Sequence, residues 1–453
     1  MTGDVDTNPP SRPVVTGNIA LAEGPAGRAI AFDRRGQIRL EVFLAEVRGV
    51  AAGLPDAAHA VILCEDRYRF LVAFCAVGLR GQIALLPPSR TPAVIAEVRA
   101  QYPDSYCISD VAMSPAPPRL HALPERLPRL EGVMPLVDTA AVAMIGFTSG
   151  STGAPCAHPK TWGSLRISNA QNLAAIRHLW PAAQSARIVA TVPPQHMYGM
   201  ELSVLLPLLS DAAVHGARPL FPEDVARALH DADTPVLLVT TPVHLRALVE
   251  SGITLPPIAG IVTATAPLPQ SLAATAEQHF GCEVREMFGA TETCVIAERR
   301  TARDTFWRPY PGVQLHPQAD GTLVSAAHLP APVLLADLIE SRHDGRFLLR
   351  GRQADLLEIA GKRASLGDLT RRLLAIPGVV DGAMFQLEEG DAGGVRRIAA
   401  VAVAPTLDEA TILDALRQSI DPAFLPRRLR LVGAMPRNDT GKLPRAELLR
   451  LLG

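Results

Sequence analysis

The sequence predicts an α/β fold, with a large N-terminal domain of mostly parallel sheets covered by helices and a smaller α+β domain at the C-terminus. Three observations support this prediction. Apolar runs alternate with helix-like segments after Gly132, which is typical of parallel sheets with helices on both faces. From Thr322 the apolar runs become short and have polar joints, which favours antiparallel structure. The length of 453 residues is also too great for one ordinary core.

The composition excludes several classes of protein. Lys and Arg total 44 against 45 Asp and Glu, so no net field draws the chain to nucleic acid or to anionic membranes. Six cysteines are scattered without a C-x-x-C pair, which argues against a zinc ribbon or a disulfide framework and fits a reducing cytoplasm. The N-terminus lacks the apolar core of a signal peptide, and no apolar run is long enough for a membrane span. We therefore expect a cytoplasmic protein.

The elements before Gly132 follow from local composition. Residues 1–16 are polar and Pro-rich and predict a loose tail. Beyond them, "AAHAVILCED" predicts a buried strand and "RFLVAFCAVGLRGQ" a helix that packs on it. The Pro-rich stretch Ser114–Gly132 predicts a surface connection with little room for a helix.

After Gly132 the pattern is regular. In "SNAQNLAAIRHLW" apolar residues recur at helical spacing, and "PLPQSLAATAEQHFG" begins at a Pro and stops at a Gly, so both segments predict helices. The predicted strands are "AAVAMIGF", "ARIVATVP", "PVLLVTTP" and "IAGIVTATA". Ligands of such sheets usually bind at the carboxyl ends of the strands. From about Ala354 we expect a separate small α+β domain.

A Ser/Thr/Gly loop directly follows the first of these strands. Its amides and hydroxyls are suited to bind phosphate oxygens, and its glycines permit close approach. The loop is not a Walker loop, because no GK[ST] follows at the required spacing. A flexible linker is the alternative, but a linker would not normally lie against a buried strand. The predicted phosphate-binding residues are Thr148, Ser149, Gly150, Ser151, Thr152 and Gly153.

The segment "TSGSTGAP" resembles the phosphate loop T-S-G-[ST]-T-G-x-P-K of the adenylate-forming (AMP-binding) superfamily, which includes acyl-CoA synthetases, aryl-acid ligases and luciferases. Further along, "EMFGATET" resembles the superfamily's Y-G-x-T-E. This resemblance implies that Phe288 and Gly289 lie beside adenine and that Thr291 contacts the α-phosphate. It also implies that Glu292 helps to hold Mg²⁺, for which a carboxylate is a suitable hard ligand. A strand followed by a polar turn is the alternative.

Three later segments extend the resemblance. "VLLADL" implies that Asp337 binds the ribose hydroxyls, although an Asp at a strand end is more often a cap or turn former. "DGRFLLRGRQADLLEIAGKRAS" implies that Arg352 reaches the ribose or phosphate. "PRNDTGKLPRAELLRLL" resembles the C-terminal P-R-x-x-x-G-K-[IL]-x-R and implies that Lys442 is catalytic. For an isolated Lys, a solvated surface position is the usual alternative.

Two segments are similar to the superfamily's substrate pocket. "PPQHMYGMELSVLLPLL" resembles P-x-x-H-x-x-G, and "TATAPLP" resembles G-G-A-P-L. The resemblance implies a catalytic role for His196, although a single His is more often structural. The implied pocket residues are Tyr198, Gly199, Met200, Thr263 and Ala264, and the implied adenosine-binding residues from the same segments are Ala266 and Pro267.

The resemblance spans about residues 30–450 and implies a domain organisation. We expect a tail at 1–16, an AMP-binding domain at 17–350, a hinge at 351–355 and a mobile C-terminal domain at 356–453 that carries the lysine. The sequence departs from the superfamily pattern at Cys156, which replaces the loop lysine, and at Ala354 and Glu358 near the hinge. Lys160, four residues after Cys156, is a candidate substitute for the missing cation.

The function implied is ATP- and Mg²⁺-dependent activation of a small carboxylic acid to an acyl-adenylate, followed by thioester formation. The chain is similar to the compact ligases of aryl-polyene and xanthomonadin pathways, which implies an acyl carrier protein as acceptor and an aromatic, hydroxybenzoate-like or acyl substrate. Free CoA is the alternative acceptor, and a non-catalytic nucleotide-binding relative is a second alternative. An Arg-rich stretch at 427–450 is suited to dock an acidic carrier or CoA, or is an ordinary solvated helix face.

Overall fold

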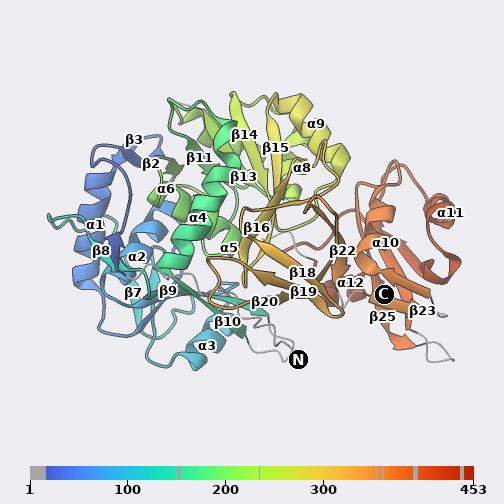
Figure 1. The fold of residues 1–453 in the computed structure, drawn as a ribbon, viewed down its shortest axis with the longest axis horizontal. Coiled ribbons are helices and arrows are strands. Elements are labelled where there is room, and N and C mark those ends of the chain that lie inside the picture. Colours follow the sequence, from blue (N-terminus) through green and yellow to red (C-terminus); the bar gives the residue numbers. More distant parts are fainter. Residues whose placement is uncertain are drawn as a thin grey trace, which may run out of the picture.

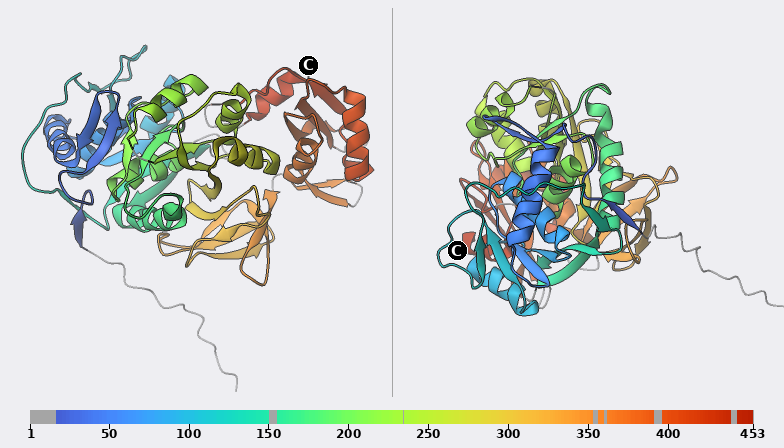
Figure 2. Two further views of the ribbon diagram at one scale, coloured as in Figure 1. Left: turned by 90° about the horizontal axis from the view of Figure 1, so that it is seen from above. Right: turned by 90° about the vertical axis from the view of Figure 1, so that its left-hand side faces the viewer.

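The computed structural model describes residues 17–149, 155–233, 235–352, 356–359, 362–390, 396–438 and 443–452. The elements up to β22 make up the larger part of the molecule, and the last elements, in orange to red, lie at one end of its long axis (Figure 1). Figure 2 shows the same arrangement from two further sides. Among the described residues, none of the helices combines the length and the apolar character that crossing a bilayer requires.

The first large sheet has six strands. In spatial order they are β10 (Pro155–Thr161), β9 (Val142–Ser149), β5 (Ile83–Leu86), β4 (His59–Ile62), β6 (Tyr106–Ser109) and β7 (Leu120–Ala122). Neighbours are parallel except β9 and β10, which form an antiparallel hairpin. Both faces are buried, because successive side chains of a strand point to opposite sides. Val61 packs with helix α3 (Pro92–Gln101), whereas Ile62 belongs to the core that contains helix α2 (Arg67–Leu79).

The second large sheet has nine strands. In spatial order they are β17 (Arg308–Pro309), β16 (Cys294–Arg299), β15 (Glu283–Ala290), β14 (Ile258–Thr263), β13 (Val236–Thr240), β11 (Arg187–Ala190), β12 (Ala213–His215), β2 (Ala29–Asp33) and β3 (Gly36–Arg39). The strands from β15 to β2 run parallel, and those at the edges are antiparallel to their neighbours. The predicted fold class is therefore confirmed.

Helices cover both faces of the nine-stranded sheet. On one face, α7 (Pro222–His230), α8 (Pro242–Ser251) and α9 (Gln270–Phe280) pack in one core with alternate residues of β11, β13 and β14. On the other face, α1 (Leu40–Gly53) and α4 (Trp162–Ile176) belong to the largest core. Short helical segments follow α4. The 3₁₀ turn Arg177–Leu179 comes directly after it, and after β11 the chain forms α5 (Met197–Met200), the π-helix Glu201–Leu205 and α6 (Leu206–Leu208).

Two predictions of element extent were incomplete. The helix predicted in "SNAQNLAAIRHLW" begins earlier, at Trp162, because the Thr161 side chain accepts a hydrogen bond from the Ser164 amide and caps it. The Pro-rich stretch contains no helix among its described residues, as expected, but it contributes the edge strand β7. Helix α9 follows Pro269 and ends at Gly281, whose φ of 65° is the left-handed conformation that the Gly stop predicted.

The chain after β17 is mostly antiparallel. The structure contains the three-stranded sheet of β18 (Gln314–Gln318), β19 (Gly321–Ser325) and β20 (Val333–Leu335), then the pairs β21 (Asp337–Ser341) with β22 (Phe347–Arg352) and β23 (Leu356–Ile359) with β24 (Lys362–Ser365). A further pair, β1 (Asn18–Ala20) with β8 (Leu136–Asp138), lies near the other end of the molecule.

The last elements build their own core. They are α10 (Leu366–Leu374), β25 (Asp381–Gly390), β26 (Arg396–Val403), α11 (Glu409–Ser419), the 3₁₀ turn Pro422–Phe424, β27 (Arg428–Leu431) and α12 (Arg445–Leu451). The apolar clusters on the two faces of the β25–β26–β27 sheet contain only residues from Leu357 onward. The boundaries at 350 and 356 and the hinge stay predictions, and residues 353–355 lie outside the described ones.

Candidate active site

A tight turn, residues 291–293, joins β15 to β16 and carries two of the predicted phosphate- and metal-binding side chains. The turn is closed by a hydrogen bond from the Thr293 amide to the Ala290 carbonyl, 3.2 Å long, and by one from the Ala290 amide to the Thr293 hydroxyl. A Cβ on Gly289 would lie 2.1 Å from the Cys294 carbonyl oxygen, so only glycine fits there. Cys294 adopts a φ of 61°, a backbone conformation that residues other than glycine rarely adopt.

The β9–β10 hairpin contacts this turn directly. A Cβ on Gly146 would meet Cγ2 of Thr291 at 2.8 Å, so the strand that leads into the Ser/Thr/Gly loop lies against the turn. The Lys160 ammonium donates a hydrogen bond of 2.5 Å to the main-chain oxygen of Glu292. Segments from distant parts of the sequence are thereby brought together at the carboxyl end of β9.

Two histidines line the same turn. The Thr148 hydroxyl and Nε2 of His158 lie 2.9 Å apart. Burial lowers the pKa of His158, the Glu292 carboxylate opposes this shift, and the Lys160 ammonium adds to it. His328 donates from Nε2 to the Thr293 carbonyl at 2.7 Å, and burial lowers its pKa, which favours the neutral imidazole. The carbonyls of Glu292 and Thr293 therefore each accept a side-chain donor.

The carboxyl end of β14 lies beside β15, where Thr263 pairs with Glu286. The Leu268 amide donates to the Glu286 carboxylate at 2.9 Å, which holds the segment containing Ala266 and Pro267 in place. Thr265 adopts a φ of 80°, and the neighbouring Thr263 hydroxyl is buried without a hydrogen-bond partner among the described residues. Strained backbone and an unsatisfied buried hydroxyl are features that cluster at functional sites. Ala264 is buried next to them.

Helix α5 and the residue before it hold the other predicted pocket residues. His196 occupies the N-cap position of α5, and its carbonyl accepts from the Met200 amide. The Tyr198 hydroxyl donates to the Val262 carbonyl at 2.8 Å, and burial raises the pKa of Tyr198. Gly199 is required, because a Cβ there would lie 2.0 Å from the Pro193 carbonyl oxygen. This segment is therefore fixed to the end of β14.

A buried carboxylate, which the sequence analysis does not single out, lies one residue after α5. Glu201 accepts hydrogen bonds from Ser168, at 2.5 Å, and from Asn172, at 2.8 Å, both on α4. It also accepts from the Val295 amide at the start of β16, and burial raises its pKa. An acidic residue within the apolar run "GMELSVLLPLL" is the signal from which this network was predictable.

Phe288 lies on β15 of the nine-stranded sheet, and Asp337 lies on β21, which belongs to a separate two-stranded sheet. The Phe288 ring packs against Trp307 and Phe347 at centroid distances of 5.5 and 6.0 Å. Asp337 is half-buried at the start of β21, directly opposite Arg352 in β22. The Asp337 main-chain oxygen accepts a hydrogen bond from the Thr322 hydroxyl.

Several predicted residues fall outside the described part of the chain. They are Gly150, Ser151, Thr152, Gly153 and Lys442; for Ser149 and Arg352 only the backbone is described. The described residues thus contain the strands on both sides of the predicted phosphate loop but not residues 150–154.

The AMP-binding enzyme family model matches residues 45–325, which is more than half of the chain. The chain belongs to the AMP-binding enzyme family. A 4-coumarate–CoA ligase of Rhodobacter capsulatus is 31% identical over 304 residues, which cover 65% of this chain and 73% of that protein. An L-proline–[L-prolyl-carrier protein] ligase of Pseudomonas fluorescens is 30% identical over 122 residues, which cover 26% of this chain and 24% of that protein. The predicted class, an ATP-dependent acid–thiol ligase, is confirmed at this level.

The fold agrees with that of solved structures. The O-succinylbenzoate Coenzyme A synthetase of Bacillus subtilis, in complex with ATP and a magnesium ion, superposes with a TM-score of 0.79 at 16% identity. The match covers 93% of this chain and 96% of that one. The AMP-binding fold therefore extends over nearly the whole chain.

The residues at the turn suit a phosphate-bound Mg²⁺ better than a metal held by protein alone. Among the described residues, no group of three His, Cys, Asp or Glu side chains lies close enough to hold a metal ion. Mg²⁺ in nucleotide sites usually takes one or two carboxylates and completes its shell with phosphate oxygens and water. A single carboxylate, Glu292, fits that requirement.

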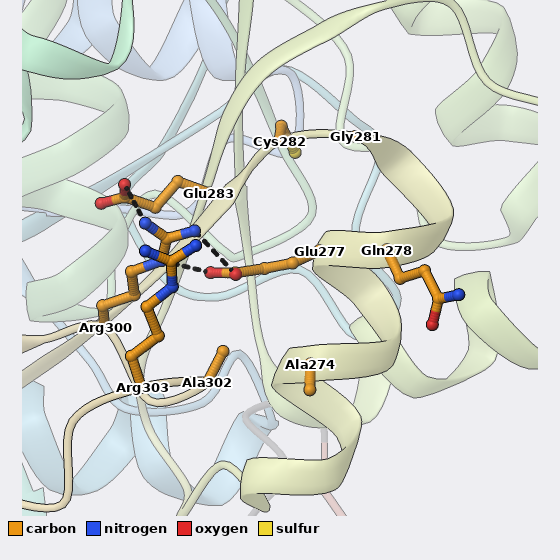
Figure 3. A pocket seen from close by; sticks show the side chains of 9 residues that line it. All are labelled: Ala274, Glu277, Gln278, Gly281, Cys282, Glu283, Arg300, Ala302 and Arg303. Carbon is orange, nitrogen blue, oxygen red and sulfur yellow. Dashed lines mark hydrogen bonds and ion pairs between the residues drawn. The ribbon is translucent and has the colours of Figure 1, made fainter.

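This AMP-binding enzyme also has a surface hollow that is separate from the predicted ATP site. It measures about 580 Å³ and lies between α9 and the start of β15 (Figure 3). Arg300 crosses it and forms ion pairs with Glu277, at 2.8 Å, and with Glu283, at 2.9 Å. None of the predicted site residues lines it, so we do not assign it to the ATP site.

Proposed function

We propose that this enzyme activates an aromatic or acyl carboxylic acid as its adenylate and then transfers the acyl group to the phosphopantetheine thiol of an acyl carrier protein. The observation that supports the first step is the contact between the β9–β10 hairpin and the 291–293 turn, made by Gly146 against Thr291 and by Lys160 on Glu292. This contact supports the proposal because it joins the strands that flank the predicted phosphate loop to the turn that carries the proposed magnesium ligand.

The chemistry requires charge neutralisation and alignment more than a protein nucleophile. A substrate carboxylate oxygen attacks the α-phosphorus, the bond between the α-phosphorus and the α,β-bridging oxygen breaks, and pyrophosphate leaves with the bonding electron pair. Because both reactants are anionic, fixed positive charge and hydrogen-bond donors lower the barrier. Mg²⁺, when bound with ATP, supplies further charge neutralisation at the phosphates. In this proposal Thr291 contacts the α-phosphate, Asp337 binds the ribose, and Lys442 bridges the reacting oxygens.

The second step breaks the mixed anhydride. The thiolate attacks the acyl carbon, a thioester forms, and AMP leaves with the bonding electron pair. We propose that His196, Tyr198, Gly199 and Met200 border the acyl pocket and the thiol entry. Because the Tyr198 hydroxyl is already bonded to Val262, it is the ring of Tyr198 that is available to shape this pocket.

The choice of a carrier protein rests on the positive charge of β27 and of Arg427, the residue before it. Arg427, Arg428 and Arg430 are exposed, and among the described residues none of them forms an ion pair. Strand β27 is an edge of its sheet, so these side chains are accessible to a partner. Carrier proteins are acidic, so this edge is complementary to them. Other arginines of the same stretch are paired; Arg437, for example, binds Asp381 at 2.6 Å.

Carboxylate-dependent exchange of labelled pyrophosphate into ATP tests the first step. We expect exchange with at least one member of a panel of aromatic and acyl acids. No exchange with any acid would favour a non-catalytic nucleotide-binding protein. A matched incubation with holo-carrier protein, apo-carrier protein and free CoA tests the acceptor. We expect thioester only on the holo-carrier, and faster product formation with CoA would make this enzyme an acyl- or aryl-CoA ligase.

A further inference from the structure

Lysine is rare in this chain, and one of its lysines is buried. Only three of the 44 basic residues are lysines, namely Lys160, Lys362 and Lys442, and all others are arginines. Lys160 is 6% exposed. Lysine differs from arginine in presenting a compact point charge with tetrahedral donors, which suits a confined site. The use of lysine at position 160 therefore calls for a local explanation.

The hydrogen bonding of Lys160 leaves its charge uncompensated at short range. Its ammonium donates to the Glu292 carbonyl, and among the described residues it forms no ion pair. A buried charge without a counterion is costly unless an anion is bound beside it. The buried Glu201 carboxylate lies near enough for the Lys160 charge to lower its pKa, but it is held by Ser168, Asn172 and Val295.

The strand register points Lys160 to the face that leads to the phosphate loop. In β10, residues Cys156, His158 and Lys160 alternate along the strand and share one face. Their partners across the hairpin are Thr148, Gly146 and Met144. Gly146 touches Thr291, and Thr148 contacts His158, so this face is the one that meets the 291–293 turn.

We propose that Lys160 is a positioning residue for MgATP. Lys160 fixes the Glu292 carbonyl, and it supplies to this face of β10 the positive charge that is missing at Cys156. The inference rests on the proposed nucleotide site. His328 holds the adjacent Thr293 carbonyl without a charge, so the two donors play different parts: both orient the turn, and Lys160 alone adds to the field at the polyphosphate. Adenosine, which carries no phosphate, does not draw on this charge.

Calorimetric titration with MgATP and with adenosine tests the proposal directly. We expect Lys160→Met to weaken MgATP binding about 10-fold or more and to change adenosine binding less than twofold. Lys160→Gln, which keeps a donor without the charge and is the gentler change if the Met variant does not fold, should weaken MgATP binding to an intermediate degree. Arg48→Met is the matched control, since Arg48 also binds main-chain oxygens, those of Leu130 and Val133, but lies on α1.

The outcomes are decisive in both directions. Equal MgATP affinities for the wild type and the Gln variant would overturn the proposal, as would a parallel loss of adenosine and MgATP binding, which is the mark of a merely structural role. Failure of the proposed function would give a different result, because the wild type would then show no pyrophosphate exchange. The ratio of MgATP affinity to adenosine affinity, compared between the wild type and the Lys160 variants, would still test the role of Lys160.

Discussion

Lys160 and the arginines at the start of β27 and directly before it place positive charge in opposite surroundings. Lys160 is buried and donates to a main-chain carbonyl, whereas Arg427, Arg428 and Arg430 are exposed and form no ion pair among the residues the structure describes. A buried charge acts strongly over a short distance, while an exposed charge is screened by salt. We infer that adenylate formation depends on the fixed electrostatic field of buried charge, and that thioester formation depends on a salt-sensitive attraction between the enzyme and the carrier protein.

The largest effect is expected from the substitution of Lys442. Lys442→Ala removes the charge proposed to bridge the carboxylate and the α-phosphate, and by analogy with the loss of an oxyanion-hole donor it should cost about 2.7–4 kcal/mol in the barrier. Pyrophosphate exchange should therefore fall by two to three orders of magnitude, at about 1.4 kcal/mol per tenfold. Thioester formation from a supplied acyl-adenylate should be nearly unchanged. Equal loss of both steps would contradict the assigned role.

The next effect concerns the rigidity of the turn. Gly289→Ala forces a Cβ to within 2.1 Å of the Cys294 carbonyl oxygen, so the β15–β16 hairpin has to shift. We expect a loss of about 1–3 kcal/mol in the free energy of unfolding, measured by urea denaturation, together with weaker MgATP binding. Gly53→Ala is the control, because nothing lies within 4 Å of the added Cβ and the helix end should be unchanged or slightly more stable. Similar stability for both variants would show that the turn is more adaptable than its contacts indicate.

Reversal of the exposed charges tests the other side of the comparison. The double variant Arg428→Glu, Arg430→Glu should lower kcat/KM for holo-carrier protein by about 10-fold at low salt, because rim charges mainly change the rate of encounter. Pyrophosphate exchange should be unaffected. The effect should shrink as salt is added, and an effect that is independent of salt would argue against an electrostatic docking edge.

The smallest effect is expected at α5. Tyr198→Phe removes one hydrogen bond, to the Val262 carbonyl, and retains the ring. Net hydrogen bonds of this kind stabilise a protein by about 1 kcal/mol, so thermal unfolding should occur a few degrees lower. Pyrophosphate exchange with the preferred acid should fall less than threefold. A much larger loss of exchange, with unchanged stability, would mean that the hydroxyl acts on the substrate.

Much of the fold and part of the site were predictable from local patterns. The runs "AAVAMIGF" and "PVLLVTTP" became β9 and β13, because continuous apolar segments bounded by turn formers have few other buried arrangements. The start of α4 was not predicted from periodicity, since it depends on the Thr161 cap. The assigned roles of Thr291, Glu292 and Asp337 stay predictions. The structure does place Thr291 and Glu292 against the β9–β10 hairpin.

The linear sequence by itself determined the alternation of strands and helices, the order of the motifs and hence the family, because these depend on residues close together in the chain. Only the tertiary structure decided that Lys160 binds the Glu292 carbonyl and that Glu201 is buried among Ser168, Asn172 and Val295. These contacts join residues far apart in the sequence, and the cost of burying their charges depends on which neighbours the packed sheets bring to them.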